Sequence, residues 1–287
     1  MKRMLLLLLL MGGISIQTFA AGSRYLYGSD IDSADSPLYY KIDPATGQIV
    51  DSYTNLPGVT GGVGVAVVGN VMYYTHAVLG DANVYKYDLA THTDLGLAFS
   101  VGSPFGGGSS LAYDGTNLWL SDPNFSNHAY LYTPTGVLLK GITLTDCFSS
   151  CVGLEYFVQN GRGFLIASEG DAYGAPSVYD VYDLNGNLVH PHLITVAGGG
   201  NWGIAWDGTH FWTADTFALS VNEWDMSGNF IQNVSVTNWL VFPPYLGDLS
   251  FDYSQTLPTP EPGTLGCLVT GAVGIVRCLK RKSFDLT

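Results

Sequence analysis

Short apolar runs alternate with turn residues along most of this chain. Runs such as "VMYYT", "LWLS", "FLIAS" and "FWTA" are rich in aromatic and β-branched residues, and Gly, Asn, Asp and Thr bound them. This pattern is typical of short β-strands, and no segment of the body has a sustained helical period. The sequence therefore predicts an all-β body.

One pattern of strands and turns recurs five times. The ends of five equivalent strands fall at intervals of 46 or 47 residues, at Asp30, His76, Asp122, Glu169 and Asp215. Four of these strands follow another strand and a tight turn, as in "LAYDGTN" and "IAWDGTH", and a second hairpin follows each of the five. Four strands in a unit of this length are typical of a propeller blade.

The first repeat lacks its innermost strand. The segment "LGDLSFDYS", residues 246 to 254, resembles "WGIAWDGTH" and has no further strands after it. We expect this strand to complete the first blade, which closes the ring and protects the sheet edges. The prediction is a five-bladed β-propeller of four-stranded blades over residues 22–257. This architecture resembles the extracellular propellers of the YVTN and WD-type superfamily. A β-sandwich is the alternative, and the regular period argues against it.

The N-terminus has the pattern of an export signal. Lys2 and Arg3 precede an apolar run from Met4 to Met11, and small residues follow around Ala20. This run is too short to span a bilayer as a permanent anchor. We therefore expect residues 1–21 to be a signal peptide.

The C-terminal segment, residues 258–287, has a second ordered pattern. A Pro-rich motif and an apolar stretch that can form a helix precede a basic end, and the marked residues are Pro260, Glu261, Pro262, Arg277, Lys280, Arg281 and Lys282. The pattern resembles the PEP-CTERM sorting tails of Gram-negative bacteria. The resemblance implies an exosortase as partner, a transient inner-membrane tether, a final place at the cell surface or outside the cell, and a link to exopolysaccharide and biofilm production. An ordinary membrane anchor is the alternative.

Charge excludes one class of partner. The chain has 24 Asp and Glu against 11 Lys and Arg, and only five of the basic residues fall in the body. Nucleic acid requires cationic contacts to its phosphates, so we expect no nucleic acid partner. The acidic balance suits an exported soluble protein and allows cation binding.

The five repeated strand ends are candidate site residues because a propeller brings them to one rim. Asp30, Asp122, Glu169 and Asp215 would form a partial acidic ring, with His76 in the fifth place. Asp at a strand end commonly caps a turn, and this is the favoured interpretation. The alternatives are binding of a ligand or of calcium, and acid–base chemistry on a glycan.

Aromatic residues in the predicted inter-blade loops add to this rim. They are Phe105, Trp202, Trp239, Phe242 and Tyr245. Such rings either stack on sugars beside the carboxylates or fill the wedges between blades. Four other tryptophans fall within predicted strands, and we expect them in the core: Trp119, Trp206, Trp212 and Trp224.

The two cysteines of the body, Cys147 and Cys151, lie four residues apart. In an exported chain a local disulfide is favoured over metal or redox chemistry. The segment "DIDSADS" resembles part of a calcium loop, but it lacks the Gly and the final Glu of an EF-hand. "HPH", at His190 and His192, has no further ligands at a recognisable spacing, so no metal ligands are assigned.

The sequence as a whole favours an exported, non-enzymatic surface protein. We expect the propeller to act as a binding or structural module for exopolysaccharide or envelope proteins. The alternative is a secreted hydrolase or lyase that acts on glycans through two of the rim carboxylates.

Overall fold

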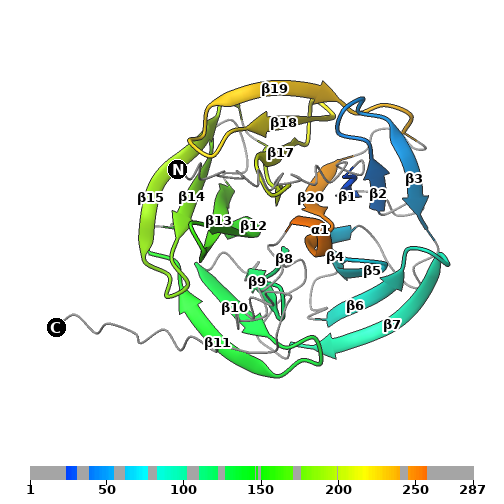
Figure 1. Cartoon of the computed structure of the whole chain (residues 1–287), viewed down its shortest axis with the longest axis horizontal. Coiled ribbons are helices and arrows are strands. Elements are labelled where there is room, and N and C mark those ends of the chain that lie inside the picture. The colour runs from blue at the N-terminus through cyan, green and yellow to red at the C-terminus, as the bar shows by residue number, and fades with distance from the viewer. Residues whose placement is uncertain are drawn as a thin grey trace, which may run out of the picture.

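The computed structural model is an all-β propeller of five blades. It describes residues 24–30, 39–54, 62–76, 83–101, 110–121, 127–145, 147, 150–170, 176–198, 200–239 and 245–256. Within these residues five antiparallel sheets of four strands each stand around a common axis (Figure 1). The predicted fold class is confirmed.

Each blade runs from an inner strand at the axis to an outer strand at the circumference. Blade 1 consists of β20 (Leu246–Phe251), β1 (Leu26–Asp30), β2 (Tyr39–Ile42) and β3 (Ile49–Tyr53). Blade 2 consists of β4 (Gly62–Val68), β5 (Val71–His76), β6 (Asn83–Asp88) and β7 (Thr93–Ser100). Blade 3 consists of β8 (Leu111–Tyr113), β9 (Leu118–Ser121), β10 (His128–Tyr132) and β11 (Leu138–Thr143).

The last two blades follow the same order. Blade 4 consists of β12 (Ser150–Gln159), β13 (Arg162–Gly170), β14 (Ser177–Tyr182) and β15 (Leu188–Val196). Blade 5 consists of β16 (Ile204–Trp206), β17 (Phe211–Asp215), β18 (Ser220–Trp224) and β19 (Phe230–Ser235). A short helix, α1 (Tyr253–Thr256), follows β20 and lies near the middle of the ring (Figure 1).

The ring closes through its C-terminal strand, as the incomplete first repeat predicts. β20 pairs antiparallel with β1, and Leu26 lies opposite Phe251 while Gly28 lies opposite Leu249. The leucine and phenylalanine side chains are buried, so this strand contributes to the core as well as to the sheet. The innermost strand of blade 1 therefore comes from the opposite end of the body.

Apolar side chains fill the wedge between each pair of neighbouring blades. The wedge between blades 4 and 5, for example, contains Phe157, Tyr179, Phe211 and Trp224. Four tryptophans that the sequence assigns to the core are buried: Trp119, Trp206, Trp212 and Trp224. Large aromatic rings fit these wedges because each ring buries a large apolar area against both blades.

The two faces of the ring carry different connections. The second strand of every blade ends at one face, here called the loop face, and the tight turns lie at the opposite turn face. On the turn face, Asp carboxylates accept backbone N–H groups two to four residues ahead, as Asp183 does from Asn185 and Asn187 and Asp225 does from Ser227 and Asn229. This local hydrogen bonding explains the frequent Asp, Asn and Gly residues between strands.

Glycine recurs in four outer turns of the turn face. Gly47, Gly136, Gly186 and Gly228 all have positive φ, a conformation that favours glycine. A Cβ at Gly228 would also overlap the carbonyl oxygen of Leu193 in blade 4, and one at Gly186 would overlap that of Thr143 in blade 3. The repeated glycine thus permits the turn and lets it pack closely on the preceding blade.

The predicted addressing segments lie outside the described residues. These are the signal peptide, residues 1–21, and the sorting tail, residues 258–287. Among the residues that the structure does describe, no helix has the length and hydropathy needed to cross a membrane.

Candidate functional site

The strand ends place four of the five predicted rim residues on the loop face. Asp30 ends β1, His76 ends β5, Glu169 lies next to last in β13, and Asp215 ends β17. The fifth, Asp122, lies outside the described residues. The topology therefore places these four residues on the same face of the ring. The contacts of each side chain differ.

Asp30 is buried at the seam between blades 5 and 1. One carboxylate oxygen accepts the Tyr40 hydroxyl at 3.3 Å, and the other accepts the Tyr245 backbone N–H at 3.3 Å. Burial, and then the nearby Asp30 carboxylate, raise the pKa of Tyr40 above its usual value, so its hydroxyl stays protonated and donates. Asp30 thereby ties the residue that precedes β20 to blade 1.

Asp215 caps the connection between β17 and β18. Its Oδ1 accepts the backbone N–H groups of Phe217 and Ala218 at 3.2 and 2.9 Å. This geometry agrees with the favoured interpretation of the strand-end carboxylates as turn caps. The side chain of Phe217, whose backbone N–H this cap binds, is 58% exposed.

Asp30, Asp215, Phe217 and Tyr245 together form a rim patch across the seam of blades 5 and 1. The rings of Phe217 and Tyr245 meet edge to face, with centroids 6.3 Å apart. The Phe217 ring also packs directly over Gly200, where a side chain would collide with it. Two aromatic rings are thus held beside two hydrogen-bonded carboxylates.

The sequence pointed to part of this patch. It singled out Asp30, Asp215 and Tyr245 but not Phe217, which follows the predicted strand end at Asp215 by two residues. The only available signal was its place directly after a predicted strand end.

His76 and Glu169 have settings of their own within the blades. His76 is buried and stacks on Tyr85, with ring centroids 4.2 Å apart and planes 9° apart. Glu169 is half-buried and is paired in the sheet with Cys151 on one side and Val178 on the other. Neither belongs to the rim patch.

The two predicted loop tryptophans are both half-buried. Trp239 donates its indole N–H to the Val236 carbonyl at 2.9 Å and meets Tyr40 edge to face at 5.0 Å, as a wedge-filling side chain would. The Trp202 carbonyl accepts the Ser168 hydroxyl at 3.0 Å, which joins blade 5 to blade 4. The other loop aromatics of the sequence analysis, Phe105 and Phe242, lie outside the described residues.

Cys147 and Cys151 are joined by a disulfide in the structure. Both are buried in the wedge between blades 3 and 4, beside Leu144 and Leu154. The pair lies in the entry to β12 and has an apolar setting, so its role here is structural.

Two buried carboxylates near the axis were not singled out by the sequence analysis. Asp248 in β20 accepts the backbone N–H groups of Val65 and Leu111, at 3.1 and 3.2 Å. These donors belong to the inner strands of blades 2 and 3, so one side chain connects three blades. The sequence offered no local signal, because the donors are distant along the chain.

Glu155 in β12 likewise connects separate parts of the ring. It accepts the Trp206 N–H of blade 5 at 3.1 Å and the Tyr253 hydroxyl of α1 at 2.5 Å. Ser250 of β20 and Asp252, which directly follows this strand, extend the arrangement by accepting further N–H groups of blade 2. Polar side chains thus satisfy backbone donors at the inner edges, which a buried backbone requires.

Burial dominates the acidity of both axial carboxylates. It raises the pKa of Asp248 to about 8, although hydrogen bonds from Ser110, Val65 and Leu111 act in the opposite direction. Burial also raises the pKa of Glu155 well above its usual value, against the lowering effect of its hydrogen bonds. Because Asp248 Oδ2 and Glu155 Oε2 accept backbone N–H groups of other blades inside the ring, we assign these carboxylates to closure of the ring.

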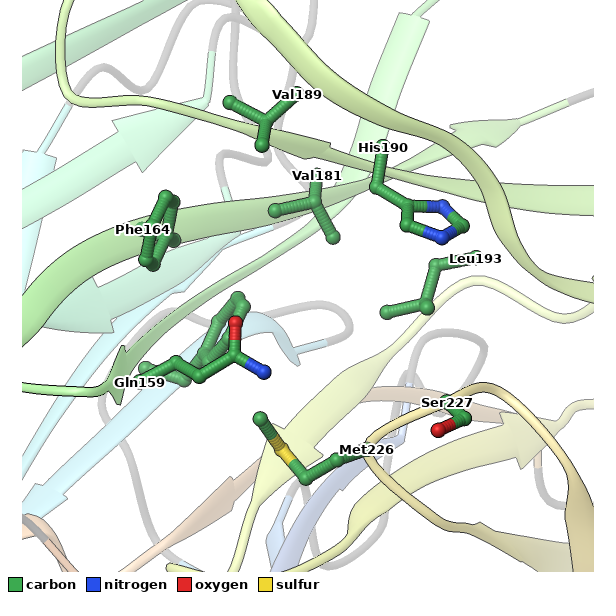
Figure 2. A pocket seen from close by; sticks show the side chains of 9 residues that line it. Gln159, Phe164, Val181, Val189, His190, Leu193, Met226 and Ser227 are labelled. Carbon is green, nitrogen blue, oxygen red and sulfur yellow. The ribbon is translucent and has the colours of Figure 1, made fainter.

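A small pocket lies on the turn face between blades 4 and 5. Its volume is about 280 Å³, and Figure 2 shows Gln159, Leu193 and Met226 pointing into the space. Its other lining residues are mainly apolar, with His190 and Ser227 at one side. The volume is just below the range of about 300–1,000 Å³ that is typical of ligand pockets.

Comparison with solved structures supports the architecture. The chain is similar to one in the crystal structure of a Nidogen/Laminin complex, with 12% identity, a TM-score of 0.51, and coverage of 81% of this chain and 99% of that one. It is also similar to a protein of unknown function from Bacteroides caccae, with 13% identity, a TM-score of 0.46, and coverage of 78% and 77%. No family model and no curated protein matches the sequence. The first similarity supports the propeller fold alone.

Proposed function

We propose that this chain is an exported, non-enzymatic binding module that holds a polysaccharide at its rim patch. The observation that carries the proposal is the exposed ring of Phe217, fixed between the Asp215 cap and Tyr245 on the loop face. Aromatic rings beside hydrogen-bonding groups suit sugars, which present both apolar faces and hydroxyls.

The contacts of the rim carboxylates favour binding over catalysis. Glycoside hydrolysis uses two carboxyl groups that flank the sugar bond and exchange protons with it. Asp30 is buried and hydrogen-bonded through both oxygens, and Asp215 accepts two backbone N–H groups. These carboxylates therefore hold the backbone of Tyr245 and Phe217 in place. Hydrolase or lyase activity on glycans is the alternative that the binding assay below also tests.

Export and processing belong to the same proposal and rest on the sequence. Residues 1–21 would direct the chain across the inner membrane, and an exosortase would then process the tail after Pro260, Glu261 and Pro262. Replacing these three residues with Ala should leave a longer, membrane-associated form in cell fractions. Unchanged mass and location of the variant would contradict exosortase processing.

The binding proposal predicts a specific loss of affinity. The purified full chain is applied to the producing cell's own exopolysaccharide, and affinity gel electrophoresis measures the binding. We expect Phe217→Ala to weaken binding at least about fivefold, because loss of a stacking aromatic ring costs on the order of 1–3 kcal/mol and 1.4 kcal/mol corresponds to tenfold. Phe217→Tyr keeps the ring and should bind within about twofold of the wild type.

Phe230→Ala is the matched control. Phe230 is similarly exposed, at 55%, but lies on the outer strand β19. The proposal fails if both alanine variants bind equally, or if the wild-type chain does not bind the polysaccharide. Release of new reducing ends during the assay would instead establish the hydrolase alternative. If the chain binds an envelope protein and no polysaccharide, the polysaccharide proposal is wrong and the partner is a protein.

A further inference from the structure

Three potential metal ligands meet in blade 5, on the turn face and on the side toward blade 1. Asp207 and His210 come from the turn between β16 and β17, and Glu223 comes from β18. One ligand atom of each lies within 4.8 Å of the others. His210 Nδ1 is 3.0 Å from Glu223 Oε1 and 3.8 Å from Asp207 Oδ2. We propose that these three side chains bind a divalent transition-metal ion of the Zn²⁺ type.

Surrounding hydrogen bonds orient both carboxylates. The Thr209 and His210 N–H groups each donate to Asp207 Oδ1 at 2.7 Å, and the Trp212 indole donates to Oδ2 at 3.0 Å. Gln232 Nε2 donates to Glu223 Oε2 at 2.7 Å, which leaves Oε1 directed at His210. Outer hydrogen bonds of this kind fix the ligands of known metal sites.

The repeat provides an internal comparison with blade 3. Asp114 caps the equivalent turn there, and its Oδ1 accepts the N–H groups of Thr116 and Asn117. Asn117 thus stands where blade 5 has His210. The sheet register places Leu131 opposite Trp119, where blade 5 has Glu223 opposite Trp212. The turn therefore needs neither the histidine nor the glutamate.

Charge and ligand type define the ion. The two carboxylates supply two negative charges, and Glu223 is only 8% exposed, so a divalent cation would offset a costly buried charge. Imidazole with carboxylate suits Zn²⁺ and its neighbours better than Ca²⁺. Three protein ligands leave a position for water, and the half-exposed His210 gives the ion a route from solvent.

Metal titration of the full chain, stripped of metal and without an affinity tag, tests the proposal. Zn²⁺ binding is measured by calorimetry, and Co²⁺ binding by its visible absorption band. We expect one ion per chain, an affinity at least about tenfold weaker in His210→Asn and in Glu223→Leu, and loss of the Co²⁺ band in both. Each variant introduces the residue that blade 3 has, so the turn and strand should be retained.

His92→Asn is the control variant. His92 Nε2 lies 3.3 Å from Asp51 Oδ2, and this exposed pair contains only one carboxylate. The His92→Asn variant should therefore bind Zn²⁺ with an affinity within about twofold of the wild type. Saturating Zn²⁺ should also raise the melting temperature of the wild type and not that of the two site variants. Absence of saturable binding below about 1 mM Zn²⁺, or equal affinity in the wild type and both site variants, would overturn the proposal.

Discussion

At the residue scale, the two axial carboxylates, Asp248 and Glu155, connect blades through hydrogen bonds. Asp248 and Glu155 are both buried, and burial raises the pKa of each carboxyl group. The Asp248 carboxylate raises the pKa of Glu155 further. One oxygen of each nevertheless accepts a backbone N–H group from a neighbouring blade. Removing either side chain would leave those donors unsatisfied, which costs about 1–3 kcal/mol per group.

Asp248 should make the protein less stable as the pH rises. Its pKa is 3.8 when unperturbed and about 8 in the folded protein, so between these values the folded state holds a proton that the unfolded state has lost. This group's contribution is therefore most favourable below about pH 4 and falls by about 1.4 kcal/mol per pH unit up to about pH 8. Urea unfolding of the full chain at pH 5, 6, 7 and 8 measures this slope.

Asp248→Asn isolates the effect. The Asn carbonyl can still accept the Val65 and Leu111 N–H groups, and it does not titrate. Between pH 5 and 7 the free energy of unfolding of the variant should fall by about 1.4 kcal/mol less per pH unit than that of the wild type. Parallel slopes for the two proteins would show that Asp248 does not hold this proton.

At the element scale, turns and strands explain why the sequence predicts so much of the fold. The Asp-Gly turn and the aromatic strand recur locally, so "LAYDGTN" and "IAWDGTH" reveal the period without any long-range information. Tertiary proximity is not local. Glu155 and Asp248 bridge different blades, and His210 meets Glu223 across two strands, so their partners emerge only when the blades assemble.

The outer-turn glycines provide a stability test at this scale. Gly228 has a φ of +75°, and a Cβ there would overlap the Leu193 carbonyl oxygen, while Gly69 has a φ of +61° and nothing within 4 Å. Gly69→Ala should lower the free energy of unfolding by about 1–2 kcal/mol, because alanine is strained in this backbone conformation. Gly228→Ala should cost about 1–3 kcal/mol more, because it also forces two blades apart.

Thermal or urea unfolding of the two variants gives the comparison. Equal losses of stability would mean that the turn does not pack on blade 4 as closely as the structure describes. A larger loss in Gly69→Ala would contradict the account outright.

At the scale of the whole molecule, closure joins the two ends of the body. β20 supplies the inner strand of blade 1. Polar side chains in β20, and Asp252 directly after it, accept N–H groups of blade 2, from Val65, Val67 and Gly69. Tyr253 then reaches Glu155 in blade 4. The rim patch depends on the same closure, since Tyr245 directly precedes β20.

Truncation separates the role of this strand from that of the tail. A chain that ends after Thr256 retains every described strand and should melt within about 2 °C of the full chain. A chain that ends after Tyr245 loses Leu246, Leu249 and Phe251 from the core and should not unfold cooperatively. Cooperative melting of the shorter chain, followed by circular dichroism, would show that the fold forms without the inner strand of blade 1.

The most direct test of the central claim is a crystal structure of the full chain with an oligosaccharide cut from the producing cell's exopolysaccharide. We predict a sugar ring stacked on Phe217, with its hydroxyls near Asp215 and Tyr245 across the seam of blades 5 and 1. A sugar bound elsewhere, for example in the turn-face pocket beside His190 and Met226, would contradict the assignment of the rim patch as the binding site.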